Sequence, residues 1–195
     1  MNQPPDKLNP KTTALLVMDY QSGIVARIPE AAALLEKAAR AIAAARRHGA
    51  RVAYVRVAFD EADANAIPAS NKAFSRFGPM IDAFRPDSPA TQIDPRIAPQ
   101  PEDILVRKTR VGAFSTTDLR EQLTGAGITA LILAGISTSG VVLSTVRDAA
   151  DRDYRLFVVA DACADPDPEV HRFLIDRIYP SQADVIDVGA IDGLF

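Results

Sequence analysis

The stretch Leu131-Ile132-Leu133-Ala134-Gly135-Ile136-Ser137-Thr138-Ser139-Gly140-Val141-Val142 joins a predicted strand to a predicted helix. Its first half is continuously apolar, which is typical of a strand buried on both faces of a parallel sheet. Its second half opens a helix on small polar residues, where backbone N–H groups and the positive end of the helix dipole converge. The junction therefore predicts a ligand site at the carboxyl end of a buried strand.

On either side of this junction, apolar runs alternate with helical patterns along the chain. The apolar runs are continuous and rich in branched residues, as buried strands are. Strands that alternate with helices at this spacing predict an α/β fold with a parallel sheet covered on both faces. We expect strands at residues 14–18, 52–57, 104–107, 129–134 and 156–160, a shorter sixth at 183–188, and helices at 30–48, 116–123, 139–152 and 168–178.

The length of 195 residues suits one domain with a full core, so we expect a single domain over residues 1–195. Residues 1–12 are expected to form an extended N-terminal tail, and residues 58–101 a long irregular insertion. Four aromatic side chains in the insertion make pure disorder implausible, and we expect them to fill a satellite core or subunit contact, with a lid or pocket wall as the alternative. They are Phe59, Phe74, Phe77 and Phe84.

Composition argues against several classes of partner. The net charge is −3 and no long basic run occurs, so a nucleic-acid partner is not expected. No apolar run approaches the ~20 residues that span a bilayer, and the N-terminus lacks the pattern of a secretory signal, so no membrane partner is expected. The single cysteine excludes an internal disulfide and fits a reducing compartment. We expect a cytoplasmic protein.

Two oppositely charged residues follow predicted strands. Asp19 comes directly after the strand at residues 14–18, and Lys108 closes the strand at 104–107. Because ligands of open parallel sheets bind at the carboxyl ends of the strands, the two charges could meet in one cleft if these strands are neighbours. Such a pair would suit acid–base chemistry, although structural ion pairs give the same pattern.

Several stretches, taken in order, resemble the isochorismatase-like hydrolases, a family that includes nicotinamidases and other cysteine amidohydrolases. The family's opening strand ends in a catalytic aspartate followed closely by glutamine, matched by Asp19 and Gln21. Its catalytic lysine is matched by Lys108. The stretches that carry the resemblance are residues 13–21, 93–99, 102–108, 113–119, 135–138, 144–145, 148–149 and 159–162.

The resemblance implies a three-layer Rossmann-like fold with a six-stranded parallel sheet flanked by helices, assembled as a homodimer or larger homo-oligomer. It implies Asp19 and Lys108 as catalytic residues, a small-molecule substrate and a cis peptide between Ile136 and Ser137 that turns backbone amides toward the substrate. No cofactor is expected. The residues expected around the substrate and its oxyanion are Ile136, Ser137, Thr138, Ser139, Gly140, Gln21 and Phe114.

The chain departs from the family at the nucleophile. The position at which a cysteine usually opens the helix holds Val141, which cannot attack a carbonyl. Cys163 follows the next predicted strand and is expected to be a structural thiol. Ser139 lies just before Val141, while Ser144 would attack from a position displaced by ~4.5 Å along the helix.

Histidines and metals are not expected at the site. The two histidines, His48 and His171, lie in predicted helices and are expected to be ordinary surface residues. Some nicotinamidases bind a metal through an aspartate and paired histidines after the second strand, but residues 59–63 contain no histidine. Acidic residues there are expected to serve an exposed loop, so no metal is predicted. The same holds for Asp161, Asp165 and Asp167.

Three functions remain open from the sequence. The first is a hydrolase of amide-like or vinyl-ether bonds that forms no covalent intermediate, with Asp19 as general acid or base and Lys108 as its electrostatic partner. True isochorismatases, which cleave a vinyl ether, also lack the thiol and usually carry glycine in its place. Val141 is bulkier, so isochorismate itself is not the expected substrate. The alternatives are a non-catalytic small-molecule binding protein and a purely structural oligomer.

Overall fold

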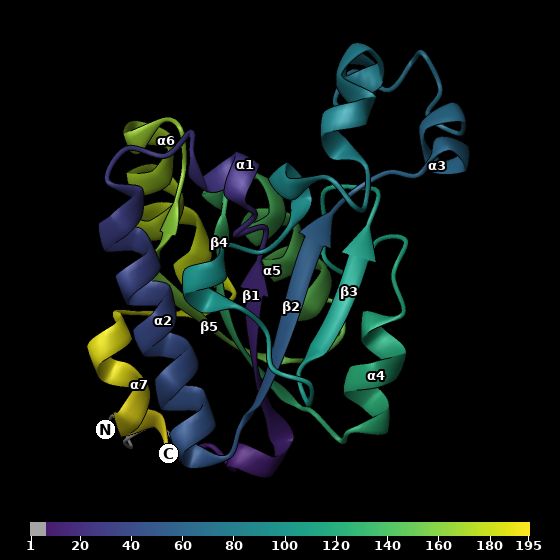
Figure 1. Ribbon diagram of the computed structural model, residues 1–195. Helices are drawn as coiled ribbons and strands as arrows, with labels where there is room; N and C mark the ends of the chain where they lie inside the picture. Colours follow the sequence, from purple (N-terminus) through teal and green to yellow (C-terminus); the bar gives the residue numbers. More distant parts are fainter. Residues whose placement is uncertain (1–6) are drawn as a thin grey trace.

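The computed structural model describes residues 7–195, except for the side chains of residues 76–80. A six-stranded sheet runs through its centre (Figure 1), with every neighbouring pair parallel and the strand order β3-β2-β1-β4-β5-β6. The order reverses between β1 and β4, which is where open α/β sheets bind their ligands. The strands are β1 (Thr13–Met18), β2 (Arg51–Val57), β3 (Ile104–Lys108), β4 (Ala130–Ile136), β5 (Arg155–Ala164) and β6 (Asp184–Ile186).

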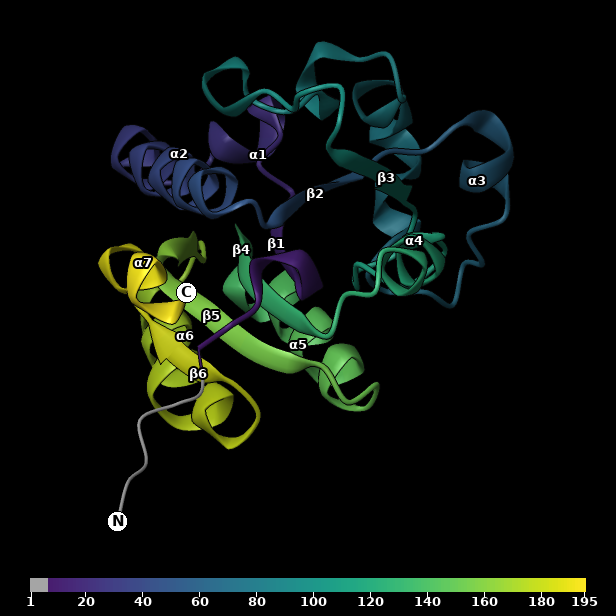
Figure 2. The ribbon, with the colours of Figure 1, turned by 90° about the horizontal axis from the view of Figure 1, so that it is seen from below.

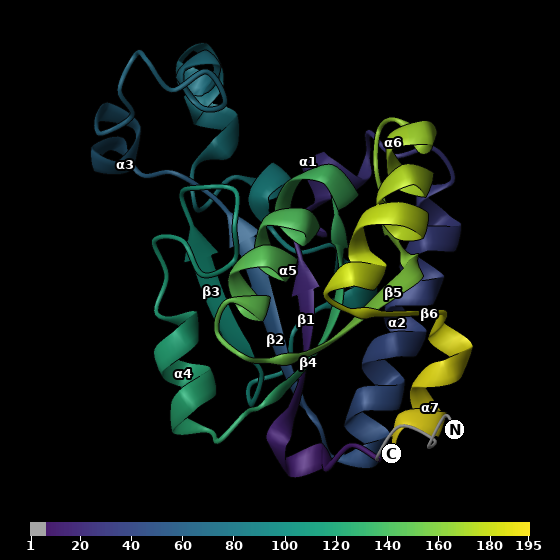
Figure 3. The same cartoon turned by 180° about the vertical axis from the view of Figure 1, so that it is seen from behind.

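Helices cover both faces of the sheet, as the sequence predicts. The longest helix, α2, lies with α7 in front of the sheet in Figure 1, and α5 lies in front of it when the molecule is turned round in Figure 3. Figure 2 looks from the amino ends of the strands and shows α2 and α5 on opposite sides. The α-helices are α1 (Ser22–Val25), α2 (Ala31–His48), α3 (Glu61–Asn65), α4 (Leu119–Gly125), α5 (Leu143–Ala150), α6 (Pro168–Phe173) and α7 (Ile191–Leu194).

Strand β1 shows how the two cores are divided. All six of its residues are buried, and successive side chains point to opposite faces. Leu15 and Val17 pack in the core beneath α2, whereas Leu16 and Met18 pack in the core beneath α5. A strand buried on both faces must be continuously apolar, which is why its sequence shows no alternation.

Most strand ends and one helix start differ from the predictions. Strands β4 and β5 run further than predicted, so Cys163 lies inside β5 rather than after it. The helix expected from residue 116 begins only at Leu119, because Thr116 has φ +61° and a helix needs negative φ. The helix expected at 139–152 opens with a π-helical turn (Thr138–Val142), and the one at 168–178 passes from α6 into a second such turn (Leu174–Ile178).

The predicted tail and insertion contain more structure than expected. Residues 1–6 lie outside the described residues, Leu8 is buried and its amide donates to the carbonyl of Leu194, and Pro10–Thr12 form a 3-10 turn. The insertion carries α3 and a long 3-10 segment (Ser75–Phe84), which project beyond the end of β3 in Figure 1. A capping box at Asp60 starts α3, and Pro10 starts the N-terminal 3-10 turn.

The ends of the helices follow the sequence signals. Helix α2 ends at Gly49, whose φ of +81° is easily adopted by glycine, and Arg46, Arg47 and His48 occupy its last turn. Helix α6 is capped by Asp167, whose carboxylate accepts from two backbone amides. Both helix ends thus carry residue types that stabilise them.

Among residues 7–195, no helix has the length and apolar character that crossing a membrane requires.

Candidate active site

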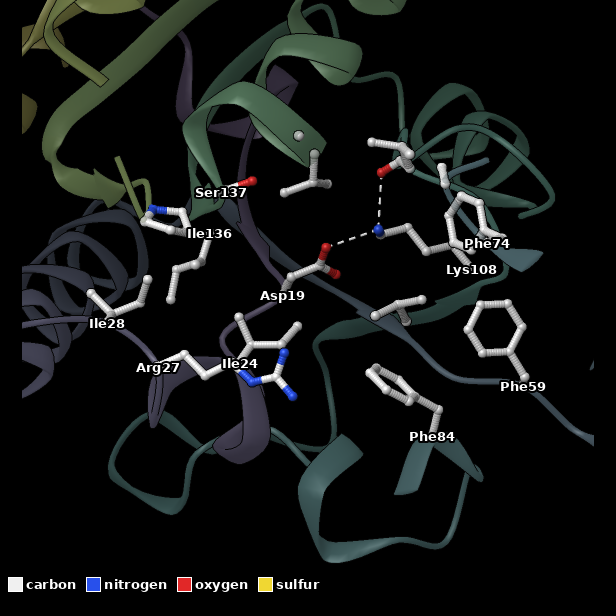
Figure 4. A pocket seen from close by; sticks show the side chains of 16 residues that line it. Asp19, Ile24, Arg27, Ile28, Phe59, Phe74, Phe84, Lys108, Ile136 and Ser137 are labelled. Atoms are coloured by element: carbon white, nitrogen blue, oxygen red, sulfur yellow. Dashed lines mark hydrogen bonds and ion pairs between the residues drawn. The ribbon is translucent and has the colours of Figure 1, made fainter. Parts of the chain in front are cut away.

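A cavity of about 300 Å³ opens at the carboxyl edge of the sheet, where the strand order reverses between β1 and β4 (Figure 4). Its walls come from the end of β1, from α1, from the insertion, from the end of β3 and from the turn after β4. The lining residues are Asp19, Ile24, Arg27, Ile28, Val57, Phe59, Ala73, Phe74, Phe84, Lys108, Val111, Ile136, Ser137, Gly140, Val141 and Pro166.

Asp19 is held in place by the two residues that follow it. Its φ of +60° is uncommon for a residue with a side chain, and such conformations persist only where the surroundings impose them. The hydroxyl of Tyr20 donates to the carbonyl of Ala162 in β5. On the other side, the Gln21 side chain accepts from the Val57 amide at 2.7 Å and donates to the Val57 carbonyl at 2.8 Å. The backbone is thus pinned to β5 and β2, which fixes the direction of the Asp19 side chain.

Lys108 reaches Asp19 from the edge of the sheet. The strands of these two residues are not neighbours, because β2 lies between β1 and β3. The long Lys108 side chain spans this gap, and its Nζ lies 2.8 Å from Asp19 Oδ2. The same ammonium donates to the carbonyls of Arg110 (3.2 Å) and Val111 (2.9 Å), so the cation is held by three partners.

The ion pair is deeply buried, with 3% of the Lys108 side chain and 7% of the Asp19 side chain exposed. Asp19 Oδ2 is paired with the ammonium, but Oδ1 is buried and has no hydrogen-bond partner in the part of the chain that the structure describes. Burial raises the pKa of the Asp19 carboxyl above its usual 3.8, against the opposing charge and hydrogen bond of Lys108. One carboxylate oxygen is therefore open to a proton within a cavity that disfavours its charge.

The turn after β4 forms the opposite wall. The peptide between Ile136 and Ser137 is cis, as the family resemblance implies. The Ser137 carbonyl accepts from the amides of Gly140 (3.2 Å) and Val142 (3.3 Å), which closes the turn. A Cβ on Gly140 would lie 2.6 Å from Ser137 Oγ, so glycine is needed for the serine hydroxyl to sit there.

Two of the residues predicted in this turn face away from the cavity. The Ser139 amide donates to Asp165 Oδ2 at 2.7 Å and so is not directed at a substrate. Thr138 is fully buried; its hydroxyl hydrogen-bonds His171 Nδ1 (2.8 Å), and its carbonyl accepts from the Tyr179 hydroxyl (2.6 Å). Both residues brace the turn from behind, while Ile136, Ser137 and Gly140 line the cavity.

Two other residues predicted at the substrate lie outside the lining. Gln21 is engaged with the backbone of β2, as described above, and Phe114 stacks on Tyr154 with ring centroids 6.1 Å apart. The guanidinium of Arg152 lies over the Phe114 ring, 5.3 Å from its centroid. Both residues lie near Asp19 or Lys108 in the sequence, but the Gln21 side chain hydrogen-bonds β2 and the Phe114 ring packs on Tyr154.

Sequence reasoning missed the contribution of α1 and the residues just after it, which supply Ile24, Arg27 and Ile28. The available signal was proximity, since this short helix begins three residues after Asp19. The aromatic residues of the insertion were predicted to fill a satellite core or to form a pocket wall. Phe59 and Phe74 do both, because they belong to a small separate core and also line the cavity. The Phe77 side chain lies outside the described residues.

Val141, at the position where the family's cysteine is expected, lines the same cavity as Asp19 and is 2% exposed. Cys163 is buried in β5 outside the lining, and burial raises the pKa of its thiol to about 12. Ser144 is also outside the lining, with its Cβ 3.5 Å from the position that a Cβ on Gly112 would take.

The acidic residues considered for metal binding have other partners. Asp60 and Asp63 form a reciprocal cap at the start of α3 and pair with Arg107, and Asp161 pairs with Lys37 at 2.9 Å. Within residues 7–195, no group of three or more histidine, cysteine, aspartate or glutamate side chains could hold a metal ion.

Comparison with known proteins identifies the family that this fold and cavity define. Residues 13–190 match the isochorismatase domain. The chain is 35% identical to the uncharacterized isochorismatase family protein YecD of Escherichia coli O157:H7, over 95% of this chain and 97% of YecD. It is 30% identical to the ureidoacrylate amidohydrolase RutB of Methylobacterium radiotolerans, over 96% and 81%. The chain therefore belongs to the isochorismatase family of hydrolases, which act on small molecules.

A solved structure agrees. An isochorismatase family protein from Burkholderia thailandensis superposes with a TM-score of 0.76 at 30% identity, over 96% of this chain and 97% of that protein. The three-layer architecture with six parallel strands is thus the architecture of the family.

Proposed function

We propose that this protein hydrolyses an amide-like or vinyl-ether bond in a small molecule, with Asp19 exchanging protons and without a covalent enzyme intermediate. The observation that carries the proposal is the buried Asp19 carboxylate, which lines the cavity and whose Oδ1 has no hydrogen-bond partner among the described residues. Val141 supports a reaction without a covalent intermediate, because the cavity wall has a hydrocarbon side chain at the position matched to the family's nucleophile.

For a vinyl ether, Asp19 acts first as an acid. Its carboxylic acid protonates the terminal alkene carbon, and the electron pair of the double bond forms the new C–H bond. Water adds to the resulting oxocarbenium ion and returns a proton to Asp19. The hemiketal then breaks its C–O bond to give a ketone and an alcohol. General acid catalysis of this kind contributes ~10²–10⁴ in rate and needs a carboxyl pKa above the ordinary range.

For an amide, Asp19 acts first as a base. The carboxylate takes a proton from water as the water oxygen attacks the carbonyl carbon. The tetrahedral intermediate then breaks its C–N bond as Asp19 passes the proton to the leaving nitrogen, giving an acid and an amine. The similar protein RutB is a ureidoacrylate amidohydrolase, which supports the amide mechanism by analogy.

Lys108 serves both branches in the same way. It stabilises the carboxylate form of Asp19 and keeps Oδ2 occupied, so that Oδ1 is the oxygen that exchanges the proton. The turn at Ser137 and Gly140 supplies the polar part of the wall, beside which a developing oxyanion would lie.

The test is a screen of amide-like and vinyl-ether metabolites, followed by mass spectrometry, with the wild-type protein and Asp19→Asn in parallel. Asparagine keeps the size of the side chain and an oxygen to accept from Lys108. We expect a substrate that the wild-type protein consumes and Asp19→Asn does not. A substrate consumed at an undiminished rate by the folded variant would remove Asp19 from the mechanism.

A second candidate function is small-molecule binding without turnover. The observation that favours it is Val141 itself, since the fold can be retained when the chemistry is lost. Compounds that raise the melting temperature but remain unconsumed over the whole screen would support this function over hydrolysis.

A further inference from the structure

Arg27 stands out among the residues that line the cavity. It lies just beyond the end of α1, it is exposed, and Figure 4 shows its side chain beside Ile24 with the guanidinium turned toward the cavity. Its backbone amide donates to the Ile24 carbonyl at 3.0 Å, which fixes the backbone. The guanidinium itself has no hydrogen bond or ion pair to any other residue that the structure describes. Five N–H donors at a cavity mouth are thus left for a ligand.

The charged side chains that line the cavity also single out Arg27. Among the described lining residues, three side chains are charged: Asp19, Lys108 and Arg27. The first two neutralise each other at 2.8 Å. Arg27 therefore leaves the cavity with a net positive charge, and a cavity with apolar walls strengthens the attraction for an anion.

The other residues that line the cavity indicate the chemical character of the rest of the ligand. Phe59, Phe74 and Phe84 form one wall, and Ile24 and Ile28 lie beside Arg27 on another. These side chains favour an apolar or aromatic body. A single planar guanidinium matches the two oxygens of a carboxylate, whereas a phosphate dianion would call for a second unpaired cation, which the described lining does not offer.

We propose that Arg27 is a specificity-determining residue that binds a carboxylate on the substrate, so that the substrates are small monoanions with an apolar body between the carboxylate and the bond that is cleaved. This inference rests on the proposed function for the cleaved bond, but the binding preference does not depend on turnover.

The test uses binding of benzoate and of benzamide, which has the same shape but no charge, measured by calorimetry. The proteins are the wild type, Arg27→Gln and Arg40→Gln. Arg40 is an exposed cation on α2 that does not line the cavity, so its variant matches the charge change. We expect benzoate to bind the wild type about tenfold to a hundredfold more tightly than benzamide, as charge-assisted hydrogen bonds provide. Arg27→Gln should lose this preference and Arg40→Gln should keep it.

Equal affinity of the wild type for the two probes, no benzoate binding at millimolar concentration, or a preference that survives Arg27→Gln would overturn the inference. The outcome for the proposed function is separate, because it depends on consumption of substrate and on Asp19→Asn. With a substrate from the screen, Arg27→Gln should raise KM far more than it lowers kcat, since Arg27 holds a part of the substrate remote from the reacting bond.

Discussion

The sheet carries a buried carboxylate paired with a cation at each of its two edges. At the carboxyl edge, Asp19 pairs with Lys108 beside the apolar cavity. At the amino edge, just before β3, Asp103 pairs with Arg46 beside a larger and more polar hollow of about 550 Å³. The Asp103 side chain is 4% exposed, so it is buried as deeply as that of Asp19.

The two ion pairs differ in the hydrogen bonds that the carboxylate accepts and in the exposure of the cation. Asp103 Oδ2 accepts from Arg46 and also from the Gln100 amide at 2.7 Å, and neither of its oxygens is left buried without a partner. Arg46 is 28% exposed, whereas Lys108 is 3% exposed. Burial of an ion pair alone therefore does not define a site. The feature that distinguishes Asp19 from Asp103 is an unpaired carboxylate oxygen beside a cavity.

The largest effect is expected from Asp19→Asn set against Asp103→Asn. If Asp19 transfers the proton, as the proposed function requires, its variant should lose activity by ~10²–10⁴, measured as kcat/KM on a substrate from the screen. Asp103→Asn should keep the activity and instead lower the free energy of unfolding by about 1–3 kcal/mol, the usual contribution of a hydrogen bond to a charged group. If both variants lost activity equally while remaining folded, the distinction between the edges would be wrong.

A second effect comes from the crowding of the backbone next to the cavity. A Cβ on Gly135 would lie 3.0 Å from the Met18 carbonyl and 3.0 Å from Val142 Cγ2, whereas one on Gly125, at the end of α4, would meet nothing within 4 Å. We expect Gly135→Ala to lower the free energy of unfolding in urea by about 1–3 kcal/mol through overpacking. Gly125→Ala is the matched control and should not destabilise. Equal stability of both variants would show that β1 and β4 can separate at low cost.

Replacement of Val141 by cysteine sharpens the comparison between a cavity thiol and a core thiol. Near the Lys108 ammonium and the first helical turn, the thiol of Val141→Cys should have a pKa below the ordinary 8.5 or so. Cys163 provides the internal reference, because burial raises its pKa to about 12. The rate of alkylation by iodoacetamide against pH separates the two. An ordinary pKa at position 141 would argue against a positive environment there.

The smallest effect is a pH dependence of stability at the turn behind the cavity. Burial lowers the pKa of His171, next to Thr138, below 6.5. Below pH 6.5 the unfolded chain therefore takes up this proton before the folded chain does, and the free energy of unfolding should fall as the pH falls. His171→Asn should weaken this fall in urea titrations at a series of pH values. An unchanged pH dependence would mean that His171 is protonated equally in both states.

Much of this arrangement could be predicted from the sequence because it depends on local patterns. Continuous apolar runs predicted the parallel sheet, and residues at strand ends predicted that Asp19 and Lys108 share one edge. The strand order could not be predicted in this way, and β2 was not expected between these two residues. The length of β5 was underestimated because this strand continues past its apolar run to Ala164 through contacts with β4.

The parts of the cavity wall that come from α1 and from the insertion depend on long-range packing, which the hydrophobic pattern of the sequence does not predict. Arg27 and the aromatic residues of the insertion reach the cavity only because α1 and the 3-10 segment fold over the same strand ends. Conversely, Gln21 and Phe114 lie close in sequence to Asp19 and Lys108, yet their side chains turn to β2 and to Tyr154. Proximity along the chain identified the strand ends but not the direction of each side chain.

The most direct measurement is the titration of the Asp19 carboxyl by carbon-13 NMR, in protein labelled at the aspartate carboxyl carbons, with the resonance assigned by its loss in Asp19→Asn. Desolvation with one unpaired oxygen predicts a midpoint above the usual 3.8. A midpoint at or below 3.8 would mean that Lys108 outweighs burial and that Asp19 is a structural partner of the lysine, as Asp103 is of Arg46.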